Sequence, residues 1–139
     1  MSSCSLQSAN LSSINLPNLS YPDIGSSTGA TPFNIIISCP SPTNLNITFT
    51  DNNNPSNTSN VLTPLANSTA KGLGIQLKYN GKIISFGPDS ANSGTTNQIV
   101  LNNNFTGTQT FPFSAAYVYT GTVTPGTLST RATFTLSYQ

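Results

Sequence analysis

The sequence contains no histidine, no glutamate and no tryptophan, and only 5% of its 139 residues are charged. Ordinary globular proteins carry about 25% charged residues. Without histidine, neither a Ser-His-Asp triad nor a histidine-ligated metal site can form. The three acidic residues, Asp23, Asp51 and Asp89, lie far apart in the sequence, which argues against a catalytic carboxylate pair. The composition therefore argues against an enzyme and predicts neither a metal nor a cofactor.

Neither positive nor negative charge is present in excess, because the net charge is only +1. We therefore expect no strong attraction to nucleic acid or to an anionic membrane surface. No apolar run approaches the ~18 residues of a membrane-spanning helix, and the N-terminus lacks the basic and apolar regions of a secretory signal. Neutral polar residues are abundant instead: 20 Ser, 20 Thr and 18 Asn. The length predicts a single domain over residues 1–139.

Two cysteines are present, Cys4 and Cys39. An even number of cysteines in a polar, charge-poor chain favours a disulfide and an oxidising compartment. The alternative is a pair of buried, reduced thiols. A metal role is disfavoured, because two cysteines without histidine supply too few ligands.

Alternation of apolar and polar residues predicts β-strands. The segments in which it is clearest are 33–39, 45–50, 75–79, 111–119 and 132–138. Asn80-Gly81 predicts a type I′ hairpin turn, with 82–86 returning as the partner strand. A single helical turn is suggested, at 65–71. Short strands at this spacing predict an all-β antiparallel sandwich.

The last alternating segment runs almost to the final residue and has a complete apolar face. Such a strand needs a neighbouring strand on each side, because an unpaired apolar edge tends to pair with other chains. No apolar alternating segment follows it in the sequence. We therefore expect the sandwich to be one strand short.

Several short motifs follow one another along the chain. They are the early Cys4, the apolar strand that ends in Cys39, the segment Gly72-Leu73-Gly74-Ile75-Gln76-Leu77 before Asn80-Gly81, the triplet Ala115-Ala116-Tyr117, Gly126 as the fourteenth residue from the C-terminus, and the penultimate Tyr138. Each motif alone is weak, but together they cover essentially the whole chain, and their order resembles that in the pilin domain of bacterial chaperone–usher fimbriae.

The resemblance implies an immunoglobulin-like sandwich that lacks its seventh strand, with Cys4 paired to Cys39. In this family a periplasmic chaperone first fills the resulting groove with one of its own strands. The N-terminal extension of the adjacent subunit replaces that strand at the outer-membrane usher, which is a form of β-strand addition. The expected locations are the periplasm during assembly and then the extracellular fimbria.

Specific residues follow from the resemblance and from the strand pattern. We expect the donor-strand groove to be lined by residues of the first and last strands: Leu11, Ile14, Leu16, Phe134, Leu136 and Tyr138. Phe33, Ile35 and Ile37 would form the floor, and for these three residues ordinary core packing is the favoured explanation. Gly126, Tyr138 and Gln139 form the expected assembly motif, in which the terminal carboxylate of Gln139 binds a basic cleft of the chaperone.

Shaft subunits of this family carry an apolar extension before the first cysteine, whereas only Met1-Ser2-Ser3 precedes Cys4 here. The chain is then either the pilin half of a two-domain tip adhesin or a shaft or adaptor subunit without its extension. The step Leu16-Pro17 and the Gly/Ser-rich stretch up to Phe33 favour the tip adhesin.

A self-contained carbohydrate-binding module with a site at 51–60 is less favoured, because Trp is absent and Asp51 lacks acidic neighbours for Ca²⁺. A jelly-roll coat protein would need eight strands and gives no reason for the cysteine pair.

Overall fold

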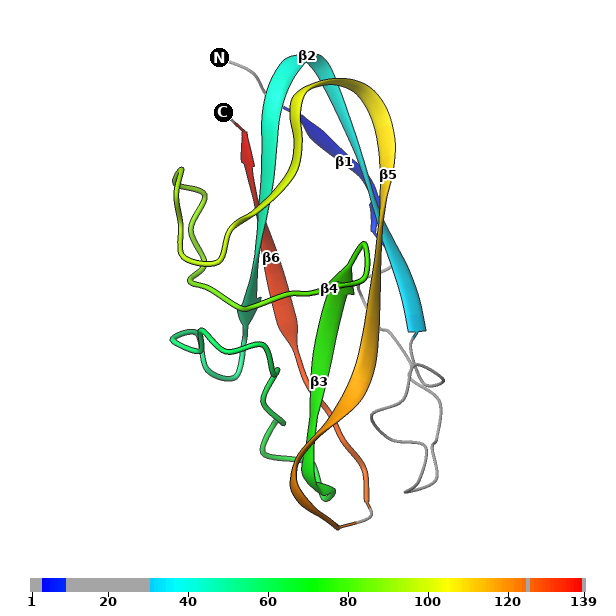
Figure 1. Ribbon diagram of the computed structural model, residues 1–139, viewed down its shortest axis with the longest axis vertical. Coiled ribbons are helices and arrows are strands. Elements are labelled where there is room, and N and C mark those ends of the chain that lie inside the picture. The colour runs from blue at the N-terminus through cyan, green and yellow to red at the C-terminus, as the bar shows by residue number, and fades with distance from the viewer. Residues whose placement is uncertain (1–3, 10–30, 125, 139) are drawn as a thin grey trace.

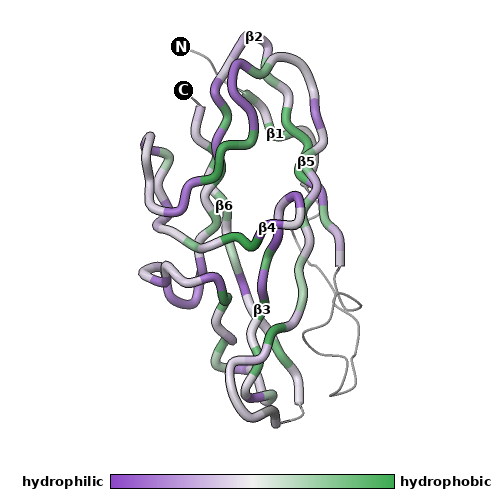
Figure 2. Tube along the Cα trace, viewed as in Figure 1, coloured by the Kyte–Doolittle hydropathy of each residue, from purple (hydrophilic) through white to green (hydrophobic). Residues whose placement is uncertain are grey.

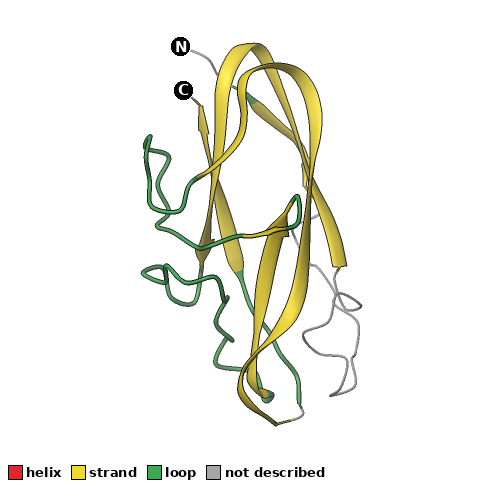
Figure 3. Cartoon of the chain, in the orientation of Figure 1, coloured by secondary structure: helices red, strands yellow, loops and turns green. Residues whose placement is uncertain are grey.

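The computed structural model describes residues 4–9, 31–124 and 126–138, which form strands and loops without a helix (Figure 3). Six strands are present in these ranges: β1 (Ser5–Ala9), β2 (Thr31–Asp51), β3 (Lys71–Tyr79), β4 (Lys82–Ile83), β5 (Ile99–Thr124) and β6 (Ala132–Tyr138). Within the same ranges, no helix has the length and apolar character needed to cross a membrane.

The long strands β2 and β5 connect the two layers of the molecule. Residues 31–39 of β2 pair with 107–115 of β5, and β1 pairs along the other edge of this part of β2. Residues 45–51 of β2 pair with β6, and the beginning of β5 lies on their other side. Figure 1 shows β2 and β5 arching over at the same end, so that each strand contributes to both layers. β3 and the short β4 extend the first layer beyond β5.

The core lies between the two layers. Phe33, Ile35 and Ile37 are buried as predicted, while Asn34 between them is exposed. Phe113 of β5 stacks on Phe33 and meets Phe49 edge-on, each at a ring-centroid distance of 5.4 Å, which joins the layers through aromatic contacts. Figure 2 shows that hydrophobic residues are spread along the strands and interrupted by polar ones. Such spacing is what strands with one buried face require.

The second half of β2 is buried on both of its faces, from Leu45 to Asp51. One face contacts the core, and the segment that leads from β4 to β5 covers the other. The N–H of Gly87 in this segment donates to the Phe49 carbonyl at 2.8 Å, and Gly87 also passes close to the Thr48 methyl group. Thr48 and Thr50 beneath it are 0% and 2% exposed, and neither hydroxyl has a hydrogen-bond partner among the described residues.

The hairpin turn is confirmed, since Asn80 and Gly81 have φ values of 52° and 77°. The strand expected at 82–86 is shorter than predicted, because β4 ends at Ile83 and the chain then crosses to Ser59, whose carbonyl accepts from the Phe86 N–H. The helical turn expected at 65–71 is wrong. That segment instead hydrogen-bonds to 127–129, for example from the Leu65 N–H to the Ser129 carbonyl at 2.8 Å.

Candidate functional site

β6 lies at the edge of the second layer and pairs with β2 over seven consecutive positions, from Leu45 opposite Tyr138 to Asp51 opposite Ala132. Its apolar side chains therefore share a face with those of β2. The β2 residues on this face, Leu45, Ile47 and Phe49, are at most 2% exposed. Their partners Phe134, Leu136 and Tyr138 pack against the same core but are only partly buried. Among the described strands, β2 alone pairs with β6.

The structure thus brings together three of the predicted groove residues on one edge strand. The other three, Leu11, Ile14 and Leu16, lie outside the described residues, as does Gln139 of the expected assembly motif. Their roles stay predictions. Burial raises the pKa of the Tyr138 phenol above its ordinary value, which agrees with a ring that lies partly inside the core.

The disulfide between Cys4 and Cys39 is present and ties β1 to the end of the first half of β2. Two residues after Cys4, Leu6 lies opposite the buried Ile37 but is 45% exposed. Residues opposite one another in an antiparallel pair share a face, so Leu6 is directed toward the core side without being covered. Sequence reasoning missed Leu6, although its spacing from the cysteine already placed both on one face.

Gly126 lies where the chain approaches β6. A Cβ atom at this position would lie 2.6 Å from the Ala70 nitrogen and 2.7 Å from the Thr69 carbonyl carbon. The N–H groups of Thr69 and Ala70 both donate to the Thr127 carbonyl, at 2.8 and 2.9 Å. The absence of a side chain therefore lets two backbone segments meet just before β6 begins.

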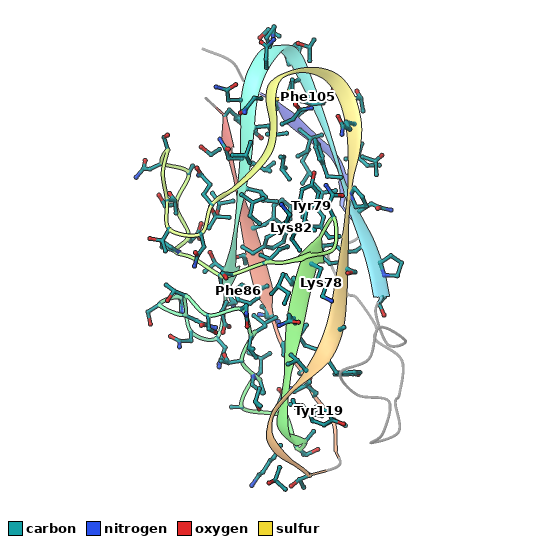
Figure 4. The ribbon with its side chains drawn as sticks, viewed as in Figure 1. Lys78, Tyr79, Lys82, Phe86, Phe105 and Tyr119 are labelled. Atoms are coloured by element: carbon teal, nitrogen blue, oxygen red, sulfur yellow. A yellow bond between two sulfur atoms is a disulfide. The ribbon has the colours of Figure 1, made fainter. Side chains whose placement is uncertain are left out.

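The edges of the two layers differ in how they are protected against pairing with another strand. At the β3–β4 edge, β4 has only two residues, and Lys78 and Lys82 flank the turn (Figure 4). The beginning of β5 is interrupted by two register shifts opposite 43–46 and by Asn104 at a φ of 56°. Short strands, lysines and bulges all hinder strand addition. β6 has none of these features, since its register is unbroken and its sequence ATFTLSY carries no charge and no proline.

The described residues at the β6 edge provide main-chain groups and apolar side chains. Among the described residues, no three His, Cys, Asp or Glu side chains lie together as metal ligands would. The described carboxylates are engaged with neutral donors. Asp51 is fully buried and accepts from Asn57 and Thr63, and Asp89 accepts from Thr135.

The family model for fimbrial proteins matches residues 2–139. The chain belongs to the fimbrial protein family. It is also 43% identical over 98 residues to the F17c-G and F17a-G fimbrial adhesins of Escherichia coli, an alignment that covers 66% of this chain and 28% of each adhesin. The matched region is thus only about a quarter of the length of these curated relatives.

Solved structures show the same fold. The P pilus rod subunit PapA superposes with a TM-score of 0.63 at 19% identity, covering 98% of this chain and 99% of PapA. The CupB6 tip adhesin from Pseudomonas aeruginosa gives a TM-score of 0.62 at 22% identity, covering 84% of this chain and 32% of that adhesin. The expected all-β, immunoglobulin-like pilin fold is therefore confirmed, and so is the resemblance to chaperone–usher pilin domains. This family is one of structural and adhesive fimbrial proteins.

Proposed function

We propose that this fimbrial domain is completed by a donor strand that adds to β6 and lies between β6 and β1. One observation carries the proposal: Phe134, Leu136 and Tyr138 are only partly buried, although the β2 residues opposite them are fully buried. A strand laid along β6 covers these three side chains and, on the other side, the exposed Leu6. The unbroken, uncharged β6 is also the edge best suited to strand addition.

The energies involved are large for a domain of this size. Complete burial of an apolar side chain contributes roughly 1.5–3 kcal/mol, and a donor strand buries its own alternate side chains as well as the exposed parts of those on β6. A whole domain is stable by only about 5–15 kcal/mol. The domain without a donor is therefore marginally stable and prone to aggregate through the β6 edge.

The family resemblance indicates which proteins provide the donor strand. A periplasmic chaperone provides the first strand, and the N-terminal extension of the adjacent subunit replaces it at the outer-membrane usher. The domain then resides in the extracellular fimbria, where it anchors an adhesin at the tip and so supports cell adhesion. The 43% identity to the F17 fimbrial adhesins supports placement in an adhesin. A truncated shaft or adaptor pilin is the second candidate.

Thermal unfolding of the chain tests strand addition directly. The probe is a synthetic peptide long enough to span β6, with apolar residues at alternate positions, and the control is a peptide of the same composition with the alternation scrambled. At about 100 times its dissociation constant, a ligand specific for the folded state stabilises by about 2.7 kcal/mol, which raises Tm by roughly 10 °C. An alternating peptide that leaves Tm unchanged would overturn the proposal.

The genomic sequence that precedes residue 1 distinguishes the two placements in the fimbria. A tip adhesin carries a separate receptor-binding domain there. A shaft or adaptor subunit carries a short alternating apolar extension instead.

A further inference from the structure

The loop at residues 88–98 is fastened to the outer face of β6, the face opposite the core. The Thr135 hydroxyl donates to Asp89 Oδ1 at 2.6 Å, and the Ser137 hydroxyl donates to the Ala91 carbonyl at 2.8 Å. Because Thr135 and Ser137 are two positions apart on a strand, both side chains leave β6 on the same side. Two successive outward side chains of β6 are thus held by one short stretch of the loop, 89–91.

The loop itself is held together by internal hydrogen bonds. The carbonyl of Asn92 accepts from the Thr95 hydroxyl at 2.7 Å and from the Gln98 side-chain amide at 3.0 Å. At the base of the loop, the Asn97 side chain donates to the carbonyls of Phe86 and Thr58, at 2.7 and 3.1 Å. The stretch that holds β6 is therefore connected through the loop to Thr58 and Phe86, outside β6.

Together with the sheet and the core, these contacts hold β6 on three sides. One edge of β6 pairs with β2, its inner face packs on the core, and its outer face is held by the loop. We propose that Asp89, together with the Ala91 carbonyl, is a positioning group that fixes β6 as a preformed acceptor for the donor strand. This inference rests on the proposed function, and it adds a kinetic role for a loop that lies on the face away from the donor.

The physical reason lies in the cost of ordering an edge strand. A strand held on one edge only is free to fray or twist, and an incoming strand must then order it during association. When the acceptor is already ordered, that cost is met by folding and association is faster. Loss of the loop contacts should therefore appear mainly in the association rate of the donor, whereas the dissociation rate depends on the contacts that the donor makes with β6.

The test measures association and dissociation of the alternating peptide with the whole chain by stopped-flow fluorescence of a labelled peptide. Asp89→Ala removes the acceptor, and Asp89→Asn retains an oxygen that accepts from Thr135. Thr135→Val removes the donor from the same pair. The matched control is Thr108→Val, because the Thr108 hydroxyl makes a comparable 3.0 Å hydrogen bond to Ser38 on a different pair of strands.

We expect Asp89→Ala and Thr135→Val to slow association by up to about fivefold, as the loss of an exposed hydrogen bond to a charged group implies. Asp89→Asn should recover most of the rate, and Thr108→Val should leave it unchanged. Native-state hydrogen exchange should show faster exchange of β6 amides in Asp89→Ala before any peptide is added. All rates are compared at a temperature where every variant is folded.

Two outcomes separate this inference from the proposed function. If the peptide binds the unaltered chain, and Asp89→Ala associates as fast with unchanged exchange in β6, the positioning role is overturned while strand addition stands. If the peptide does not bind the unaltered chain, strand addition itself fails. Equal slowing by Asp89→Ala and Thr108→Val also contradicts the inference, since it would indicate a general loss of stability.

Discussion

Leu136 lies directly opposite Ile47 in the antiparallel ladder between β6 and β2, yet Ile47 is 0% exposed and Leu136 is only partly buried. Side chains paired in this way share one face of the sheet and lie close enough to be covered by the same neighbours. The difference in burial therefore shows that, among the described residues, the cover over this face ends between the two strands.

This pair gives a prediction with a built-in comparison. Ile47→Ala should lower the free energy of unfolding of the chain alone by about 2–5 kcal/mol, because it opens a cavity in a closed part of the core. Leu136→Ala should cost clearly less in the chain alone, since its side chain is already partly solvated. With the alternating peptide bound, the cost of Leu136→Ala should approach that of Ile47→Ala.

Urea unfolding of both variants, with and without the peptide, measures these differences. The two substitutions remove similar volumes from facing positions, so each serves as the control for the other. Equal costs in the absence of peptide would show that Leu136 is as well covered as Ile47, and that β6 has no open face.

The Cys4–Cys39 disulfide should be a major source of stability. It joins the five-residue β1 to β2 and closes a loop with a sequence separation of 35. Replacing both cysteines by serine should lower the free energy of unfolding by about 2–5 kcal/mol, the usual cost of removing a native disulfide from a small domain. The measurement is urea unfolding of the variant beside the oxidised and reduced parent chain.

Mass spectrometry under non-reducing conditions provides the control, because the parent chain should contain no free thiol. If reduction leaves the unfolding midpoint unchanged, the disulfide contributes nothing to the stability of the folded chain.

Gly126→Ala should destabilise the entry to β6. The added Cβ would meet the backbone of Thr69 and Ala70, which is held by hydrogen bonds to Thr127 and cannot move cheaply. Overpacking of this kind costs about 1–3 kcal/mol. Thermal unfolding measures the loss, and Gly121→Ala is the matched control, because a Cβ at Gly121 would meet nothing within 4 Å. A Gly126→Ala variant as stable as Gly121→Ala would contradict the close approach.

Two buried threonines of β2 allow a substitution that should not lower stability, unlike those described above. The hydroxyls of Thr48 and Thr50 have no described partner, so Thr48→Val or Thr50→Val should leave stability unchanged or raise it by about 1 kcal/mol. Thr43 is equally buried, but its hydroxyl donates to the Ser41 carbonyl at 2.8 Å. Thr43→Val should therefore lower stability by about 1 kcal/mol. Urea unfolding compares the three variants, and a clear loss at Thr48 would indicate that an ordered water bridges its hydroxyl.

Much of the fold was predictable from local pattern. Alternation identified the strands around Ile35, Ile75 and Phe134, because each presents one face to the core and the other to polar surroundings. Asn80-Gly81 identified the hairpin turn, because both residues tolerate the positive φ that this turn requires. The apolar face of 132–138 was also readable in the sequence, and its side chains are only partly covered by the described residues.

Other features depend on contacts between distant segments. The beginning of β5 was missed, because its run of asparagines and its two register shifts break the alternation around Val100. Residues of β2 after Leu45 are buried continuously because a distant segment crosses over Thr48. The local sequence pattern of β2 could not predict this cover. The hydrogen bond between Asp89 and Thr135 links residues 46 positions apart. The place of Gly126 in the assembly motif stays a prediction, and its close fit against Thr69 depends on a tertiary contact that the sequence could not show.

The arches of β2 and β5 have a mechanical consequence. Because each strand runs without interruption from one layer into the other, a pulling force that enters through β6 reaches the opposite layer along covalent backbone rather than through side-chain contacts alone. Parting the layers would require both polypeptide bridges to straighten. Under the strand addition proposed above, tension along β6 instead loads its seven ladder positions with β2 together, in shear.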